Sequence, residues 1–593
     1  MDLREIRETS IWQLYNKGVN FQRLQGVYTD TDRNNNFYNG NQWEGAKLGS
    51  VEPIQANFIK PIVKYKVSVI HDNLYAIVYS SQNYRDQAFQ REAGRYCEML
   101  NRYAAQVWEK EKMDFKGRRV TKDAAINDEG IIYVSFDQEH MLPVNEVIDK
   151  CDIYYGNEND DDIQNQPYIL IRKRMPVVNA VDLALAEGLS QEDVHYIIGD
   201  NETFEQSGEA AKQEVDDQVT IVYKLYKRNN TVHFSCATRY VDICEDVDMG
   251  LKYYPVAHFV WEEKKGSARG EGEVRYQIPN QIEVNRTFMR RALTVKLQAY
   301  PKMVADTSKI SNPSQLGVVG GIIKTNGTPV EDVHKIVGTL EPAQMSQDVK
   351  LLQDDLINVT RELAGAGETA TGQVDPESAS GRAILAVQQA SQAPMTEQKE
   401  SYKNFIEDIA RIWLDYLIVY SEDGVDMEEA ITDPASGEEI IQIVNIPQAT
   451  LQQLNASVKI DITPKSVYDR FAQEQTIENL MLQGFFNPQR MGELDIYTKI
   501  LPDDSVAPKQ AIKDAVRYMK EEQMRIAQIQ AQAQMMQQRA QEFLMADPDG
   551  QVQQMVDARN QLMQQPEEEP IEGEEEVVQA EEELPEPEIP EEE

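Results

Sequence analysis

The sequence predicts an α+β fold that is mainly helical and divided into several domains. Three observations lead to this prediction: a length of 593 residues, strand-like segments concentrated in residues 130–261, and helical spacing of apolar residues over much of the remaining chain. Typical domains contain roughly 100 to 200 residues, so a chain of this length exceeds one domain. Its 41% hydrophobic and 27% charged residues are typical of globular proteins.

The first 261 residues predict helices followed by strands. Residues 11–122 have a mostly helical pattern, interrupted at 57–70 by an apolar, β-branched stretch that contains Pro61. After residue 130 the spacing changes to the alternation of half-buried strands. The expected strands are residues 131–136, 168–171, 219–226, 232–236 and 256–261.

The middle of the chain predicts two helices separated by a β-like excursion. A Gly-rich linker, residues 264–272, precedes a helix expected from Pro279 to about residue 300, where Pro301 ends it. In the excursion, residues 315–325 and 333–338 are expected to pair. The second helix is predicted because apolar residues recur at spacings of four and three, on one face. These residues are Met345, Val349, Leu352, Leu356, Val359 and Leu363.

A flexible loop and a long helix are expected next. Residues 364–381 are rich in Gly, Thr and Ser, and a helical pattern then resumes over residues 382–420 with a kink or break at Pro394. The second half of this helix is amphipathic and is predicted to be buried. Its apolar side is formed by Phe405, Ile409, Ile412, Trp413, Tyr416 and Tyr420. A hairpin around 433–438, a strand at 458–462 and short helices over 467–501 follow.

The carboxy-terminal part predicts one long helix and an acidic tail. Residues 509–546 contain no proline or glycine and would span about 57 Å as a helix. Two positions of its heptad repeat form a seam along the helix, and nine of the ten residues at these positions are apolar. We expect this seam to pack against copies of the chain. The seam includes Ile512, Met519, Ile526, Ile529, Met536 and Phe543. Residues 566–593 contain 15 glutamates without Lys or Arg and are expected to be disordered.

The charge balance argues against tight binding of nucleic acid. The net charge is −41, and without the terminal 15 glutamates 85 acidic residues still face 59 basic ones. Binding to phosphates requires Lys and Arg that displace counterions. The segment from Arg275 to Lys302 is a local exception to this acidic balance. Against the single acidic residue Glu283 it contains six basic residues: Arg275, Arg286, Arg290, Arg291, Lys296 and Lys302. These either contact passing DNA or pair with Asp348, Asp354 and Asp355 of the next helix, and we favour the pairing.

No pattern of catalytic, metal-binding or cofactor-binding residues is recognisable. A phosphate-binding Gly-x-x-x-x-Gly-Lys-Ser/Thr loop is absent, and the six histidines and four cysteines are scattered. Asp30, Asp32 and Asn34 begin like a calcium loop but lack its later Gly and Glu, and Asp160 to Asp162 are interpreted as a solvated loop. Neither a secretory signal nor a membrane-spanning run is apparent, so we expect assembly in a cytoplasm.

One segment carries a family resemblance. Residues 266–286 read Gly-Ser-Ala-Arg-Gly-Glu-Gly-Glu-Val-Arg-Tyr-Gln-Ile-Pro-Asn-Gln-Ile-Glu-Val-Asn-Arg. This segment resembles the start of the first stem helix in portal proteins of tailed bacteriophages, through Gly270, Gly272, Pro279, Gln281 and Asn285. Residues 37–43, Phe-Tyr-Asn-Gly-Asn-Gln-Trp, and 380–383, Ser-Gly-Arg-Ala, also resemble that family. The order of these parts matches over residues 10–546, and the layout is most similar to portals of short-tailed phages with a helical barrel.

The resemblance implies a ring subunit with named regions. They are a helical wing part (1–125), a β-rich wing part (126–262), the first stem helix (263–300), the clip (301–343), the second stem helix (344–363), the tunnel loop (364–381), a kinked helix (382–420), a wing or crown region (421–505), the barrel helix (506–565) and the acidic tail (566–593). The implied tunnel-loop residues are Gly365, Gly367, Glu368, Thr369, Thr371, Gly372 and Gln373, and the implied clip residues are Lys302, Lys309 and Lys324.

The resemblance also implies a function. The chain would form a dodecameric ring at one capsid vertex of the virion, as the channel for genome packaging and ejection. Its partners would be double-stranded DNA, the terminase large subunit, head–tail adaptor proteins, and major capsid and scaffolding proteins, with no membrane. Two alternatives stay open: a non-ring scaffold or adaptor that uses the long helix as a coiled coil, and an enzyme with a buried carboxylate or histidine cluster in a deep pocket.

Overall fold

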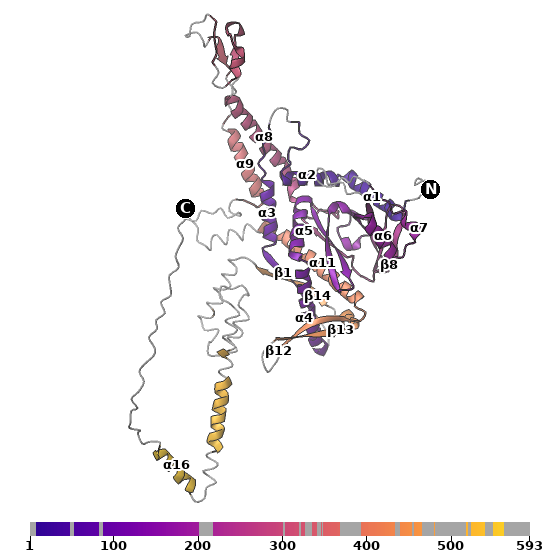
Figure 1. Ribbon diagram of the computed structural model, residues 1–593, viewed down its shortest axis with the longest axis vertical. Helices are drawn as coiled ribbons and strands as arrows, with labels where there is room; N and C mark the ends of the chain where they lie inside the picture. The colour runs from indigo at the N-terminus through magenta and orange to yellow at the C-terminus, as the bar shows by residue number, and fades with distance from the viewer. Residues whose placement is uncertain are drawn as a thin grey trace. The chain divides into compact units, whose positions relative to one another are not determined.

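The computed structural model describes residues 8–47, 52–81, 87–200, 217–299, 303–318, 322–326, 335–340, 346, 348–367, 393–432, 439–453, 456–464, 480, 518–519, 524–539 and 550–562. It divides into two compact units, Met1–Asp469 and Arg470–Glu593. Each unit is considered by itself. Figure 1 shows the chain coloured from its amino to its carboxy terminus.

Five helices and one strand form the amino-terminal region. The helices are α1 (Ser10–Gln25), α2 (Val27–Asn39), α3 (Ile59–Ile70), α4 (Gln87–Lys110) and α5 (Met113–Asn127), and β1 (Asn73–Ser81) follows α3. The β-branched stretch is therefore helical. Its Pro61 lies in the first turn of α3, where a missing N–H breaks no helical hydrogen bond. Strand β1 was not predicted, because its segment was interpreted as part of a helical region.

A three-stranded antiparallel sheet lies at the centre of the first unit. Its order is β3-β2-β9, with β2 (Glu129–Asp137), β3 (Leu142–Ile148) and β9 (Val256–Val260). Helices α5 and α11 (Thr396–Tyr420) pack against this sheet. The predicted apolar side of α11 is confirmed as buried from Phe405 to Tyr416, and Tyr420 is half-buried. The central core is therefore made by segments that are up to about 280 residues apart in sequence, as in the bond from the Tyr416 hydroxyl to the Val134 carbonyl.

A second sheet has five antiparallel strands in sequential order. They are β4 (Ile153–Tyr155), β5 (Ile169–Pro176), β6 (Gln218–Arg228), β7 (Thr231–Ala237) and β8 (Asp242–Asp248), with short 3₁₀ turns η2 (Lys150–Asp152) and η3 (Ile163–Asn165). Trp12 and Tyr15 of α1 pack on one face. Helices α6 (Val177–Ala186) and α7 (Gln191–Val194) cover the other. All five predicted strands are confirmed here and in the central sheet, whereas β3, β4 and β8 were missed.

Two long helices, α8 (Glu273–Ala299) and α9 (Asp348–Leu363), lie side by side (Figure 1). Helix α8 begins six residues earlier than expected, so Pro279 lies inside it. Between the helices are β10 (Met303–Ala305), η4 (Thr307–Lys309), η5 (Pro313–Gly317) and β11 (Val337–Thr339). The predicted pairing of 315–325 with 333–338 is wrong: β10 pairs with β11, and Ile310 forms a separate bridge with Thr325.

The remaining described elements complete the first unit. The turn η7 (Ala393–Met395) precedes α11, so the break expected at Pro394 is present, and residues 382–392 lie outside the described part. The predicted hairpin is formed by β12 (Val425–Thr432) and β13 (Glu439–Ile446). After α12 (Gln448–Gln453), β14 (Ala456–Pro464) confirms the expected strand and pairs with β1. Residues 467–501 lie outside the described part except Leu480.

The described part of the second unit is helical. It comprises residues 518–519 and 524–539, within the predicted long helix, and α16 (Gln551–Leu562). Residues 566–593 lie outside the described part. Among the helices that the structure describes, none combines the length and apolar content needed to cross a lipid bilayer.

Candidate functional site

The base of the α8/α9 hairpin is held by two buried amide side chains of α8. The Gln281 side chain accepts a hydrogen bond from the Phe58 backbone N–H, 3.1 Å, and donates one to the Ala56 carbonyl, 2.8 Å. Asn285 accepts from the Ala56 N–H, 3.2 Å, and donates to Gln42 Oε1, 2.6 Å. Because an unpaired buried polar group is costly, these bonds fix the segment before α3 against α8.

Gln42 links this joint to the amino-terminal motif. Its Nε2 donates to the Phe37 carbonyl, 2.9 Å, and Asn57 donates to the Tyr38 carbonyl, 3.0 Å. We call Gln42, Gln281 and Asn285 the amide joint. The two motifs that carried the family resemblance, residues 37–43 and 266–286, are therefore bonded to each other at the point where the hairpin meets the rest of the unit.

The second half of the predicted Gly-rich linker, residues 268–272, is largely buried, whereas Lys264 to Gly266 are exposed. A Cβ atom on Gly270 would lie 2.5 Å from the Glu262 carbonyl oxygen, and one on Gly272 would lie 2.9 Å from the Asp128 backbone nitrogen. Real side chains do not approach backbone so closely, so only glycine permits this path. The segment can therefore bring Arg269 into the interior.

Arg269 is the centre of a buried ionic network. Its guanidinium pairs with Glu129, donates from Nε to Glu158 Oε2, 3.0 Å, and from Nη2 to the Ile153 carbonyl, 3.1 Å. His258 Nε2 is 2.8 Å from Glu129 Oε2. Burial alone would raise the pKa of Glu129, but the charge of Arg269 and the hydrogen bond from His258 outweigh it and lower the pKa to about 2. Sequence reasoning missed this network, because its members are up to 140 residues apart.

This network is the buried carboxylate and histidine cluster that the enzyme alternative requires. Each charged group in it already has a partner: Glu129 has Arg269 and His258, and Arg269 also has Glu158. The carboxylate is held ionised by these contacts. The network therefore has the form of a structural ion pair, and it fixes the residues that precede α8.

The basic residues predicted on the first long helix lie on α8, but their pairing differs from the prediction. Arg286 and Arg290 both lie near Glu283 of the same helix, at 3.5 and 3.4 Å, while Arg275 and Lys296 are exposed. Arg291 donates to Gln353 of α9, 2.8 Å. The favoured ion pairs with the α9 aspartates are wrong, because Asp348, Asp354 and Asp355 are exposed on other sides of α9.

The contact between α8 and α9 is partly polar. Besides the Arg291–Gln353 bond, Asn280 donates to Thr360 Oγ1, 3.0 Å, and both Gln353 and Thr360 are buried. The predicted apolar stripe of α9 is turned largely outward. Leu352 is 54% exposed, Val359 49% and Leu363 80%. The helix prediction is confirmed. Within one chain the stripe is covered only in part, since Val349 and Leu356 are half-buried and Leu356 packs on the core.

The first residues of the predicted tunnel loop end α9. Gly365 has φ 67°, and the N–H of Ala366 bonds to the Arg361 carbonyl, 2.8 Å, as in a left-handed helix cap. Ala364 and Ala366 are buried, and a Cβ on Gly365 would lie 3.7 Å from Pro394. Gly367 is described and lies next to Glu362. Glu368, Thr369, Thr371, Gly372 and Gln373 lie outside the described residues. The chain thus leaves α9 and returns to η7 at adjacent points.

The excursion between α8 and α9 brings two of the predicted clip lysines onto facing segments. The Asn326 N–H bonds to the Lys309 carbonyl, 2.9 Å, and the Ser311 N–H to the Lys324 carbonyl, 2.8 Å. Lys302 lies outside the described residues. Four large apolar side chains of this excursion are more than half exposed: Val304, Val318, Ile322 and Leu340.

The predicted seam of the long carboxy-terminal helix is exposed where it is described. Met519 is 39% exposed, Ile526 49%, Ile529 60% and Met536 73%. Ile512 and Phe543 lie outside the described residues. An exposed apolar stripe of this kind marks a surface that needs a partner.

The two acidic groups that were considered as cation sites in the sequence do not have the geometry of such sites. Asp30, Asp32 and Asn34 lie on helix α2, so they do not form the loop that calcium sites of this type require. Asp162 caps η3 by accepting from the Gln164 N–H, 2.8 Å. Within the described part of the chain, no group of three or more His, Cys, Asp or Glu side chains converges as metal ligands do.

Comparison with known proteins places the chain in a family. A family model described as Phage P22-like portal protein matches residues 22–569. No curated protein matches the chain. The matched region includes the amide joint, the α8/α9 hairpin and the long carboxy-terminal helix. Because this match covers nearly the whole chain, the chain belongs to the Phage P22-like portal protein family, structural and non-enzymatic proteins that connect head and tail in bacteriophage virions.

Proposed function

We propose that twelve copies of the chain form a ring at one capsid vertex and that the genome enters and leaves the capsid through this ring. The observation that carries the proposal is the partly uncovered apolar stripe of α9, in which Leu352 and Leu363 are more than half exposed. Burial of apolar surface is the main favourable contribution to association, so such a stripe favours contact with a sister copy. The contact joins different faces of neighbouring subunits and closes into a ring.

We assign the regions of the ring to the elements of the chain. The amino-terminal helices and the two larger sheets form the wing, α8 and α9 the stem, residues 301–343 the clip, residues 364–381 the tunnel loop, and the long carboxy-terminal helix the barrel. The four exposed apolar side chains of the excursion support docking by the clip. Its partners in this proposal are the terminase large subunit during packaging and head–tail adaptors afterwards. Capsid and scaffolding proteins surround the wing.

The acidic balance suits a conduit for DNA. Phosphates are repelled by a wall of like charge and therefore slide with little adhesion, whereas a wall of arginines would hold them. In the stem, Arg286 and Arg290 both share Glu283, so their positive charge is partly offset on their own helix. The DNA thus meets a channel that confines it without binding it tightly.

Class averages of the purified protein by electron microscopy test the ring, and native mass measurement tests the number of subunits. We expect twelvefold rings with a central opening wide enough for a DNA duplex. Dimers or trimers without an opening would support instead the scaffold that uses its long helix as an ordinary coiled coil.

The tunnel loop is tested by replacing residues 368–381 with a short Gly-Ser linker, which leaves the buried Ala364 and Ala366 in place. Because the chain leaves α9 and enters η7 at adjacent points, rings should form normally. DNA packaging or retention in infected cells should fall.

The matched control replaces residues 203–214, whose flanks are also adjacent, since the Asp200 N–H bonds to the Gln218 carbonyl at 2.9 Å. Packaging should be normal in the control. Unchanged packaging in the 368–381 variant would remove the role assigned to this loop.

A further inference from the structure

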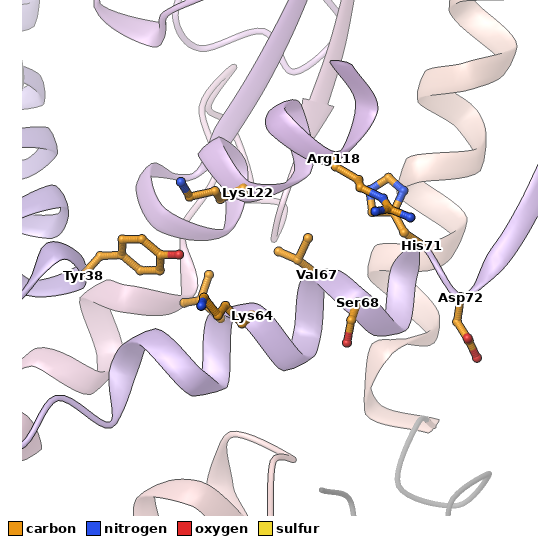
Figure 2. A pocket seen from close by; sticks show the side chains of 9 residues that line it. Tyr38, Lys64, Val67, Ser68, His71, Asp72, Arg118 and Lys122 are labelled. Carbon is orange, nitrogen blue, oxygen red and sulfur yellow. The ribbon is translucent and has the colours of Figure 1, made fainter. Parts of the chain in front are cut away.

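A cavity of about 280 Å³ opens between α3 and α5, away from the amide joint and the ionic network. Figure 2 shows that Lys64, Val67 and Ser68 come from α3, Arg118 and Lys122 from α5, and Tyr38 closes one end. His71 and Asp72 lie at the other end. No role in the portal proposal uses this pocket.

The pocket is basic in a strongly acidic chain. Lys64, Arg118 and Lys122 line it, and the only lining carboxylate among the described residues is Asp72. The Asp72 carboxylate points away from the three cations in Figure 2, and its charge acts on Lys399. Outside the lining, Asp123 is the carboxylate whose charge acts on Lys122. The pocket therefore concentrates positive charge on a protein of net charge −41.

Two other lysines of these helices are paired with carboxylates. Lys66 of α3 lies 2.6 Å from Glu273, and Lys116 of α5 lies 2.7 Å from Glu111. By contrast, with the part of the chain that is described, Lys64, Arg118 and Lys122 form no ion pair within 4.0 Å. Like charges brought together without carboxylates repel, so an arrangement that only stabilised the fold would not favour them.

Contacts within the chain hold part of the pocket lining in place. Lys122 Nζ lies 5.2 Å from the centre of the Tyr38 ring, and Lys60 Nζ lies 5.6 Å from it, so both ammonium groups are held at the aromatic ring. His71 Nε2 lies 3.0 Å from Thr121 Oγ1, and its ring packs edge-on against Tyr402 at 5.0 Å. Val63 is fully buried beneath the pocket. Of the three cations of the pocket, Lys122 is thus held by a contact within the chain before a ligand arrives.

We propose that this pocket binds a phosphate group, contributed either by a DNA backbone or by a free phosphate compound. Two ammonium groups and a guanidinium match the charge and the acceptor oxygens of phosphate. The inference goes beyond the ring and channel. It can fail or succeed independently of them, because it is measured on the isolated protein in any oligomeric state.

The test titrates the full-length protein with inorganic pyrophosphate by calorimetry at low salt. The variant Lys64→Gln with Lys122→Gln should bind pyrophosphate about tenfold more weakly, because two of the three cations of the pocket are lost; this change corresponds to about 1.4 kcal/mol for the two together. The control variant Lys17→Gln with Lys110→Gln makes the same charge change at exposed positions of α1 and α4 and should stay within about twofold of the wild type. Absence of binding, or equal losses in both variants, would overturn the proposal.

A second pair of variants compares neighbouring arginines on α5. Both arginines are exposed, but Arg118 lines the pocket, whereas Arg119 lies outside the lining and 4.0 Å from Asp123. Arg118→Gln should weaken pyrophosphate binding several-fold and Arg119→Gln should not; the reverse order would contradict the site.

Competition identifies the source of the phosphate. A 20-base-pair duplex that displaces pyrophosphate from the wild type, and does so less well from the lysine double variant, identifies DNA. Binding of pyrophosphate without displacement by the duplex identifies a free phosphate compound.

Discussion

The packed sheets of the first unit and its α8/α9 hairpin differ in how many of their side chains find partners within the chain. Around the sheets, even the charged groups find partners within the chain: Arg269 is almost fully buried and meets Glu129 and Glu158. On the hairpin, Leu351 is 61% and Leu363 80% exposed. The comparison teaches that one part of the subunit is stable by itself, whereas the other presents apolar surface that sister copies would cover.

The largest expected effect is a loss of stability in the packed sheets of the first unit. Glu129→Gln leaves the buried Arg269 without its main counter-charge, and removal of one partner of a buried pair costs about 3–5 kcal/mol. The free energy of unfolding is measured by denaturant titration. Glu139→Gln, at an exposed position, is the control and should change this free energy by less than about 0.5 kcal/mol. Similar losses in both variants would show that the network does not stabilise the fold.

The same variant predicts a pH dependence. Since the pKa of Glu129 is about 2 in the folded protein and 4.5 ordinarily, its contribution is complete above about pH 4.5 and is lost as pH falls toward 2. The difference in stability between wild type and Glu129→Gln should therefore be constant from pH 7 to 5 and shrink below it. A difference that grows on acidification would contradict the assigned ion pair.

A smaller effect is expected at the boundary between the two parts. Gln281→Ala removes the acceptor of the Phe58 N–H and the donor to the Ala56 carbonyl, which costs about 1–3 kcal/mol. Hydrogen exchange at the Phe58 amide should accelerate. Gln298→Ala, exposed on the same helix, should leave both stability and exchange unchanged. An unchanged Phe58 amide in the Gln281 variant would mean that the joint is not formed.

On the hairpin, a change in assembly is expected without a change in stability. Leu352→Ser removes an exposed apolar side chain of α9, so the stability of one subunit should change by less than about 0.5 kcal/mol. Sedimentation should nevertheless show fewer rings and more small species. Asp354→Ser, exposed on the same helix, is the control and should assemble normally. Normal assembly of the Leu352 variant would exclude this stripe from the interface.

The smallest effect is expected from the carboxy-terminal segment. Deletion of residues 507–593 removes the exposed seam and the acidic tail, and rings should persist if the stem and wing make them. Electron microscopy of the truncated protein measures this. Monomers after truncation would transfer ring formation to the long helix.

Helices and strands with a clear apolar period were predicted from the sequence, whereas the distant segments that they contact were mostly not predicted. The buried face of α11 and the hairpin of β12 and β13 follow from local spacing. Strand β1 was missed because its partner β14 lies far along the chain, with Ile77 opposite Ile460. Arg269 looked like part of a Gly-rich linker, because nothing near it in sequence identifies Glu129 as its partner. The contact of Arg291 with Gln353 was likewise not apparent, since aspartates were the expected partners.

By itself, the sequence determined most of the long helices and the longer strands, the apolar side of helices such as α11, and the motifs that indicate the portal family. These features depend on residues within a few turns of each other. Only the tertiary structure decided that residues 268–272 of the Gly-rich segment are largely buried, that the two motifs are bonded through Gln42 and Asn285, and that the apolar stripe of α9 is left partly uncovered. These features depend on which distant segments come into contact. Burial makes each contact specific, because a buried polar group needs a hydrogen-bonding partner. An exposed apolar stripe is covered only when another copy packs against it.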